Sequence, residues 1–163
     1  MLTDNVLGID LGTQSLKVGV YSTDGKCLDR ASASYPTYNR NDGYSEQDPN
    51  DWWSALQTAM QSVSQSIDME RIKGITFCAT SSTVLLTDEW MQPIGLAQCW
   101  MDQRSINEED EINRNEHAAV KERLRYSGEK TSIEWMLTKS LWLKKNHNLT
   151  GKRIVEQIDW MNY

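Results

Sequence analysis

Cysteine, phenylalanine and proline are scarce in this sequence. Its 163 residues include three cysteines, one phenylalanine and three prolines. Three widely spaced cysteines make neither a disulfide framework nor a zinc-ligand pattern, so both classes of small stapled domain are excluded. Cys78 and Cys99 lie in apolar contexts, and we expect both to be small core residues.

Basic residues and long apolar runs are also in short supply. The 17 Lys and Arg residues stand against 23 Asp and Glu residues, for a formal net charge of −6. No basic stripe is present that could release counterions from a nucleic acid or hold an anionic membrane. No apolar run reaches the ~20 residues that cross a bilayer, and the chain does not open with a basic-then-apolar signal layout. We therefore expect a cytoplasmic protein that binds neither nucleic acid nor membrane.

The first forty residues have the pattern of a three-stranded meander. Residues 6–11 form a β-branched and apolar run typical of a buried strand, and residues 16–21 alternate apolar and polar side chains. The dipeptide at 24–25, Asp-Gly, is a strong hairpin signal, so residues 27–34 are expected to form an antiparallel third strand. Residues 35–50, rich in Asn, Asp, Gly, Tyr and Pro, are expected to be a loop.

A helix is predicted to begin with Asp48 as its cap and Pro49 at its first position. Its apolar face would comprise Trp52, Trp53, Leu56, Met60, Val63 and Ile67. Further strands are predicted over residues 72–79, 83–87 and 96–100, with a turn over 88–93.

Two capping-box patterns predict two later helices. Ser105-x-x-Glu108 would open a polar helix with a solvated acidic face over residues 108–111. Thr131-x-x-Glu134 would open a helix that buries Ile133, Met136, Leu137, Ser140 and Leu141.

This order of elements favours an α/β fold with a mixed sheet flanked by helices, of the ribonuclease H-like or actin-like type. The chain stops in an apolar, uncapped run over residues 158–163. We therefore expect that the chain is cut rather than finished and that its domain is incomplete.

The hairpin between the first two strands carries the chemistry. Asp10 ends the first strand, and Gly12, Thr13, Gln14 and Ser15 form the bend. A phosphate site needs close backbone approach, which glycine allows, and oriented N–H and O–H donors. A carboxylate beside it can hold Mg²⁺ directly or through water. The alternative is an ordinary hairpin with a turn glycine and a capping acid.

The segment Gly8-Ile9-Asp10-Leu11-Gly12-Thr13-Gln14-Ser15-Leu16-Lys17 resembles the first phosphate-binding motif of the FGGY carbohydrate kinases. The resemblance continues through Ser45-Glu46-Gln47-Asp48-Pro49-x-x-Trp52-Trp53 and Gly74-Ile75-Thr76-Phe77-Cys78-Ala79-Thr80-Ser81-Ser82-Thr83. It extends to Trp100-Met101-Asp102-Gln103-Arg104 and to the segment from Met136 to Lys145. The resemblance covers nearly the whole chain, and the Ala-Thr-Ser-Ser turn is closest to the ribulokinase members.

The resemblance implies ATP-dependent phosphorylation of a sugar or polyol hydroxyl, such as that of a pentulose. Asp10 would bind Mg²⁺, and the bend with Lys17 would bind the phosphates of ATP. The sugar site would be lined by Thr80, Ser81, Trp100, Asp102 and Arg104. These residue types suit a sugar, because a hydroxyl-rich ligand needs paired hydrogen bonds from polar side chains and an aromatic face for its C–H side.

Simpler interpretations stay open for the sugar-site residues. Trp100 could be a core side chain, and Asp102 could only pair with Arg104 at a strand end. The segment Thr80–Ser82 could be only a polar turn. If the last strand includes residues 102 and 104, both side chains would project to the same side.

No catalytic residue is assigned within the chain. The resemblance places the catalytic base, an Asp in a Gly-x-x-Asp context, downstream of residue 163, together with the adenine pocket of a second domain. It thus implies that residues 1–163 are the N-terminal portion of the first domain, without the second, nucleotide-binding domain. We therefore expect the chain to be inactive alone and to self-associate through an exposed sheet edge. The alternatives are a sugar- or phosphate-binding interaction module without chemistry and another actin-fold ATPase.

Overall fold

The computed structural model describes residues 4–40 and 42–163. The chain forms two compact units, each built from segments that are distant in sequence. The first comprises the residues up to Thr37, Asp48–Thr80 and Ile158–Tyr163. The second comprises Tyr38–Gln47 and Ser81–Gln157.

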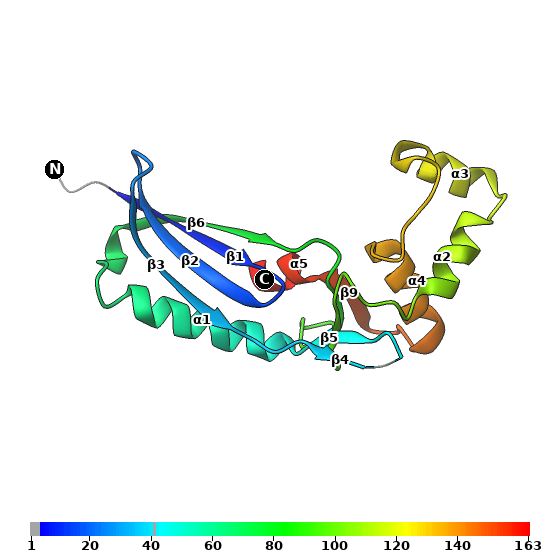
Figure 1. Ribbon diagram of the computed structural model, residues 1–163, viewed down its shortest axis with the longest axis horizontal. Coiled ribbons are helices and arrows are strands. Elements are labelled where there is room, and N and C mark those ends of the chain that lie inside the picture. Colours follow the sequence, from blue (N-terminus) through cyan, green and yellow to red (C-terminus); the bar gives the residue numbers. More distant parts are fainter. Residues whose placement is uncertain (1–3, 41) are drawn as a thin grey trace. The chain divides into compact units, whose positions relative to one another are not determined.

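A four-stranded mixed sheet is the centre of the first unit (Figure 1). Its order is β3-β2-β1-β6, with β1 at Asn5–Leu11, β2 at Ser15–Ser22, β3 at Cys27–Ser34 and β6 at Ile72–Ala79. The first three strands are antiparallel neighbours, and β6 pairs in parallel with β1. The predicted meander and the predicted helix-linked strand are confirmed, with bounds that agree to within one residue.

One face of this sheet is buried beneath helix α1 (Pro49–Val63), which packs on β2 and β3. The strands place alternate apolar side chains on that face: Leu7, Ile9, Leu11, Leu16, Val18 and Val20. Because successive side chains of a strand point to opposite faces, Asp10 and Lys17 project from the other face.

Helix α1 begins as the sequence predicts. The side chain of Asp48 accepts a hydrogen bond from the Asn50 N–H at 2.9 Å, and Pro49 occupies the first turn. Trp52 is fully buried and meets Trp160 of helix α5 (Gln157–Asn162) edge-on, with ring centroids 6.0 Å apart. The neighbouring Trp53 is 49% exposed, so its placement on the packed face was wrong. Successive residues of a helix lie about 100° apart, and only one of the two tryptophans faces the sheet.

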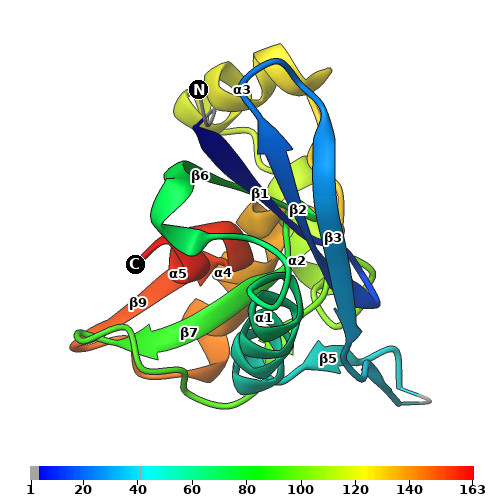
Figure 2. The ribbon, with the colours of Figure 1, turned by 90° about the vertical axis from the view of Figure 1, so that its left-hand side faces the viewer.

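The second unit contains a five-stranded antiparallel sheet of order β4-β5-β8-β7-β9. Its strands are β4 at Tyr38–Asn39, β5 at Ser45–Gln47, β7 at Val84–Asp88, β8 at Ala97–Gln98 and β9 at Lys152–Glu156. Figure 2 shows β7 and β9 side by side.

In this sheet two predictions differ from the structure and one strand was missed. The segment 35–50, expected to be a loop, contributes β4 and β5, while Asn41 within it lies outside the described residues. The strand expected over 96–100 is reduced to β8, and β9 was not predicted. Two- and three-residue strands owe their conformation to the partner backbone, which leaves little periodicity in the sequence.

Three helices complete the second unit: α2 at Ile106–Asn113, α3 at Ala118–Leu124 and α4 at Met136–Asn146. Short 3₁₀ turns occupy Met69–Arg71 in the first unit and Arg125–Ser127 in the second. Neither predicted capping box forms. The hydroxyl of Ser105 donates to Thr138 Oγ1 at 3.3 Å instead of capping α2, and α4 begins five residues after Thr131.

The helix faces also differ from the prediction. Glu108 is buried and accepts a hydrogen bond from Lys145 at 3.0 Å, so the acidic face of α2 is not wholly solvated. Helix α4 buries Thr138, Lys139 and Leu143, whereas Leu137, expected inside, is half exposed. Lys139, which was not in the expected buried set, is buried because its ammonium group donates to three backbone carbonyls.

The core of the second unit is a small apolar cluster between β7 and α4, made of Val84, Leu86 and Leu143 with Met136, Trp142, Leu149 and Ile154 packed against it. Cys99 is buried as expected, whereas Cys78 is exposed, because it stands on the uncovered face of the first sheet. Among the described residues, no helix is both long enough and apolar enough to cross a bilayer.

Candidate functional site

The bend between β1 and β2 is closed tightly by its own backbone. The Gly12 N–H donates to the Ser15 carbonyl at 3.0 Å, so this amide is used within the hairpin. The Tyr35 hydroxyl donates to the Gly12 carbonyl, and the Tyr35 N–H donates to the Gln14 carbonyl at 3.2 Å. A Cβ on Gly12 would lie 3.3 Å from the Ser15 oxygen, which explains why glycine stands there. The bend is therefore held in place by hydrogen bonds from Tyr35, the residue that follows β3.

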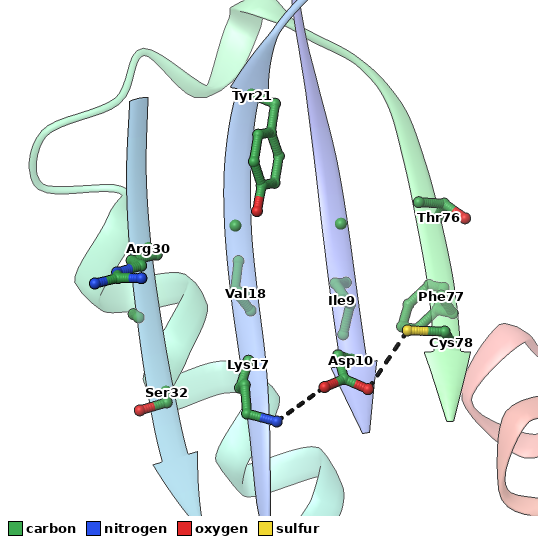
Figure 3. A pocket seen from close by; sticks show the side chains of 13 residues that line it. Ile9, Asp10, Lys17, Val18, Tyr21, Arg30, Ser32, Thr76, Phe77 and Cys78 are labelled. Atoms are coloured by element: carbon green, nitrogen blue, oxygen red, sulfur yellow. Dashed lines mark hydrogen bonds and ion pairs between the residues drawn. The ribbon is translucent and has the colours of Figure 1, made fainter. Parts of the chain in front are cut away.

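Asp10 lies at the foot of this bend, in a row of polar side chains across three strands (Figure 3). Its Oδ2 accepts a hydrogen bond from Lys17 Nζ at 2.9 Å, and its Oδ1 accepts one from the Cys78 thiol at 3.4 Å. The side chain of Asp10 is 45% exposed, so the carboxylate is open to a ligand from the solvent side.

The electrostatics of this row keep the carboxylate ionised. The hydrogen bond from Lys17 lowers the pKa of Asp10, although partial burial opposes it. Although Cys78 as a whole is exposed, partial desolvation of its thiol raises the pKa of Cys78, and the neighbouring Asp10 raises it further. At neutral pH the row therefore holds an anion, a cation and a neutral thiol.

These side chains border a hollow of about 750 Å³ on the open face of the sheet. Its floor is the cross-strand pair Gly8 and Gly19, over which the ring of Tyr21 lies (Figure 3). Arg30, Ser32 and Thr76 line its sides. A floor of glycine backbone between a carboxylate and two basic side chains leaves room for a polar, anionic ligand.

The residues at this hollow fit a magnesium ion but not a fully protein-coordinated metal. Among the described residues, no group of three or more His, Cys, Asp or Glu side chains could hold a metal ion. Mg²⁺ keeps several waters and is commonly held by one or two carboxylates together with substrate phosphates. The single accessible carboxylate of Asp10 matches that mode of binding.

The expected sugar-contacting turn follows β6. Thr80 in the first unit is tied down, because its N–H donates to the Leu11 carbonyl at 3.0 Å and its hydroxyl lies 3.4 Å from the same oxygen. Ser81 in the second unit is exposed, and Ser82 has a positive φ of 64°. The segment is a turn, which agrees equally with a sugar-contacting turn and with a merely polar one.

Asp102 and Arg104 form an internal network in the second unit. Asp102, 1% exposed, accepts hydrogen bonds from the Ser45 N–H at 2.7 Å and from the Arg104 guanidinium at 2.8 and 2.7 Å. Arg104 also donates to Glu46 at 2.7 Å. The two residues lie beyond the end of β8, so the condition under which both would project from one strand is not met. They pair with each other, as the simpler interpretation expected.

The Arg104 guanidinium is also enclosed by aromatic rings, 3.7 Å from the centre of Tyr44 and 5.1 Å from that of Trp142. Its side chain is only 6% exposed. Of the expected sugar-site residues in this unit, Ser81 and the half-buried Trp100 retain access to solvent.

The sequence assigned no role to Glu46, Tyr44 or Lys139, all of which the structure places around this network. Glu46 stands in the Ser-Glu-Gln motif before α1, and Lys139 in the motif of α4. Its place in that motif, and its charge within a partly apolar helix pattern, were the signals for Lys139.

Comparison with known proteins identifies the family. Residues 5–162 match the family model described as the FGGY family of carbohydrate kinases, N-terminal domain. A xylulose kinase of Staphylococcus epidermidis is 35% identical over 107 residues, which cover 64% of this chain and 22% of that protein. A D-ribulokinase of Saccharomyces cerevisiae is 28% identical over 152 residues, covering 86% of this chain and 21% of that protein.

Comparison with solved structures also finds sugar and polyol kinases. The crystal structure of Plasmodium falciparum glycerol kinase with ADP superposes with a TM-score of 0.82 at 19% identity, over 98% of this chain and 33% of that one. The chain thus spans between about a fifth and a third of the proteins it matches. Since the family model matches nearly all of its residues, the chain belongs to the FGGY family of carbohydrate kinases and lies within that family's N-terminal domain.

Proposed function

We propose that this chain supplies the first phosphate- and Mg²⁺-binding motif and part of the sugar site of an ATP-dependent kinase acting on a pentulose or a related polyol. The observation that carries the proposal is the Asp10–Lys17 pair, which stands in an open hollow at the foot of a rigid glycine-containing bend. The related xylulose kinase and D-ribulokinase support the substrate class, and the glycerol kinase solved with ADP supports the nucleotide.

The phosphate contacts are assigned to the bend. The backbone and side chains of Thr13, Gln14 and Ser15 supply donors, and Lys17 supplies a positive charge. Gly12 acts through its missing side chain, since its N–H already bonds to Ser15. Asp10 would hold Mg²⁺, which when bound neutralises charge on the phosphate oxygens.

The sugar contacts are assigned to Thr80, Ser81 and Trp100. Asp102 and Arg104 take a supporting role, because their charged groups already bond to each other and to the β5 segment. Hydrogen-bonded groups that do not touch the ligand commonly hold the contacting side chains of a binding site in place.

The chain alone is proposed to bind nucleotide weakly and to have no kinase activity, with the catalytic base located beyond residue 163. In the first sheet, β3 and β6 each pair with one described strand only, and we propose these edges as the route of any self-association. Three unpaired cysteines are consistent with a reducing compartment, and the proposed location is the cytoplasm.

A nuclear magnetic resonance titration tests the phosphate site. Amide spectra of the ¹⁵N-labelled chain are recorded with millimolar Mg²⁺·ADP for the wild type and Asp10→Asn. Asp4→Asn is the matched control, because Asp4 is an exposed aspartate immediately before β1. Shifts confined to residues 10–17, and weakened only by Asp10→Asn, are expected. Shifts elsewhere, or equal shifts in all three proteins, would refute the site, and ATP turnover with ribulose or xylulose would refute inactivity.

A further inference from the structure

Lys139, on α4 in the second unit, is fully buried, with a relative exposure of 0%. Its Nζ donates three hydrogen bonds, to the carbonyls of Trp100 at 3.1 Å, Ile133 at 3.0 Å and Glu134 at 3.0 Å. All three N–H bonds of the ammonium group are thereby used. One side chain on α4 joins the turn after β8 to the segment that precedes the helix.

The burial of this ammonium group is costly, and no carboxylate contacts it directly. Among the described residues, none of the ion pairs includes Lys139, although Asp102 and Glu134 act on it at longer range. Burial accordingly lowers the pKa of Lys139 to about 8. A methionine would fill the same space without that penalty, but it could not donate to the three carbonyls.

The turn that Lys139 holds is the one that carries Trp100. Two backbone hydrogen bonds hold the ends of this turn. The Asp102 N–H donates to the Cys99 carbonyl at 3.0 Å, and the Cys99 N–H donates to the Ser45 carbonyl at 2.9 Å. The Trp100 carbonyl lies between these ties and points to Lys139. This bond holds the peptide group that follows Trp100, whose side chain is half-buried.

We propose that Lys139 is a positioning residue of the sugar site, which holds the Trp100 turn, and so the indole ring, in the orientation that receives the sugar. The proposal rests on the assignment of Trp100 to the sugar site made above. Lys139 itself touches backbone carbonyls only, so it acts through Trp100 rather than on the ligand.

A change in protonation gives the proposal a specific signature. A neutral amine has two N–H bonds, so deprotonated Lys139 must release one of its three carbonyls. The charged or titratable groups that act on Lys139 are Asp102, Glu134, Cys99 and Arg104. Burial raises the pKa of Cys99 to about 12, so its thiol stays neutral through the window around pH 8.

The test follows the ¹³C carbonyl shift of Trp100 and the ¹⁵N shift of Met101 in the labelled full chain between pH 6.5 and 9.5. The wild type is expected to show one inflection near pH 8. Lys139→Met should lack the inflection, and Lys144→Met, an exposed lysine on the same helix, should keep it. A Trp100 carbonyl without an inflection in the wild type overturns the proposal, even if Lys139→Met fails to fold.

A second arm titrates the same proteins with D-ribulose and D-xylulose at pH 7 and pH 9, with the Trp100 indole resonance as the readout. Weakening of about tenfold is expected for Lys139→Met at pH 7, the equivalent of one charged hydrogen bond. The wild type should weaken at pH 9 in the same direction. Equal affinity in the wild type and Lys139→Met, at both pH values, overturns the positioning role. If no protein binds sugar while the carbonyl inflection is present, the sugar-site assignment fails and Lys139 keeps only its hold on the turn.

Discussion

The Arg104 network allows the sharpest stability prediction. Its guanidinium donates to Asp102 at 2.8 and 2.7 Å and to Glu46 at 2.7 Å. It lies 3.7 Å from the ring centre of Tyr44 and 5.1 Å from that of Trp142. Arg104→Met would keep most of the packing volume but leave two carboxylates without their cation. Removing one partner of a buried ion pair costs roughly 3–5 kcal/mol of unfolding free energy.

The expected loss for Arg104→Met is therefore about 4 kcal/mol. Arg104→Lys should lose about half as much, because an ammonium group keeps the charge but cannot bond both carboxylates in a fork or stack as a plane. The matched control is Arg114→Met, whose pair with Asp110 is 3.0 Å long but solvent-exposed, and it should cost under ~1 kcal/mol.

Urea unfolding followed by circular dichroism at 222 nm measures these changes. An Asp102→Asn/Arg104→Met double variant completes the cycle and should lose much less than the sum of its single variants. If Arg104→Met and Arg114→Met have the same small effect, the buried network does not support the second unit, and a ligand-binding role for Arg104 becomes the better explanation.

Three further predictions concern the first unit. Asp48→Ala should lower the free energy of unfolding by about 1 kcal/mol, as measured in urea, because the α1 cap is lost. Gly19→Ala places a Cβ 2.7 Å from the Tyr21 ring and should cost about 1 kcal/mol, but it should be neutral or stabilising in a Tyr21→Ala background. Partial burial and Asp10 both raise the pKa of Cys78, so Asp10→Asn should lower this pKa and speed the alkylation of Cys78 by iodoacetamide at pH 8. Mass spectrometry of the Cys78 peptide measures the alkylation rate, and a rate that does not rise would contradict the prediction.

Most of the first unit could be predicted because its signals are local. Strands β1 to β3 have seven or eight residues each, and apolar and polar side chains alternate along them. The turn at 24–25 has a strong hairpin dipeptide, and Asp48-Pro49 marks the start of α1. The second unit could not be predicted as well. Its strands β4, β5 and β8 have two or three residues and are defined by pairing across long stretches of sequence.

The candidate site follows the same division. Asp10 and Lys17 are cross-strand partners in a predictable hairpin, so their proximity could be predicted from register alone. The enclosure of Arg104 by Tyr44 and Glu46 depends on contacts between residues some 60 apart in the chain, which no local pattern reports. The predicted capping box at Ser105 failed for a related reason, since Thr138 receives the hydroxyl that should have capped α2.

The central claim is that the bend after β1 receives the phosphates of a nucleotide and that Asp10 shares their metal ion. Paramagnetic broadening tests it most directly, with Mn²⁺ substituted for Mg²⁺ in the presence of ADP. The amide signals of residues 10–14 should broaden first in the wild type and remain sharp in Asp10→Asn. Broadening centred on another acidic segment, such as residues 108–111 of α2, or identical broadening in the two proteins, would contradict the account.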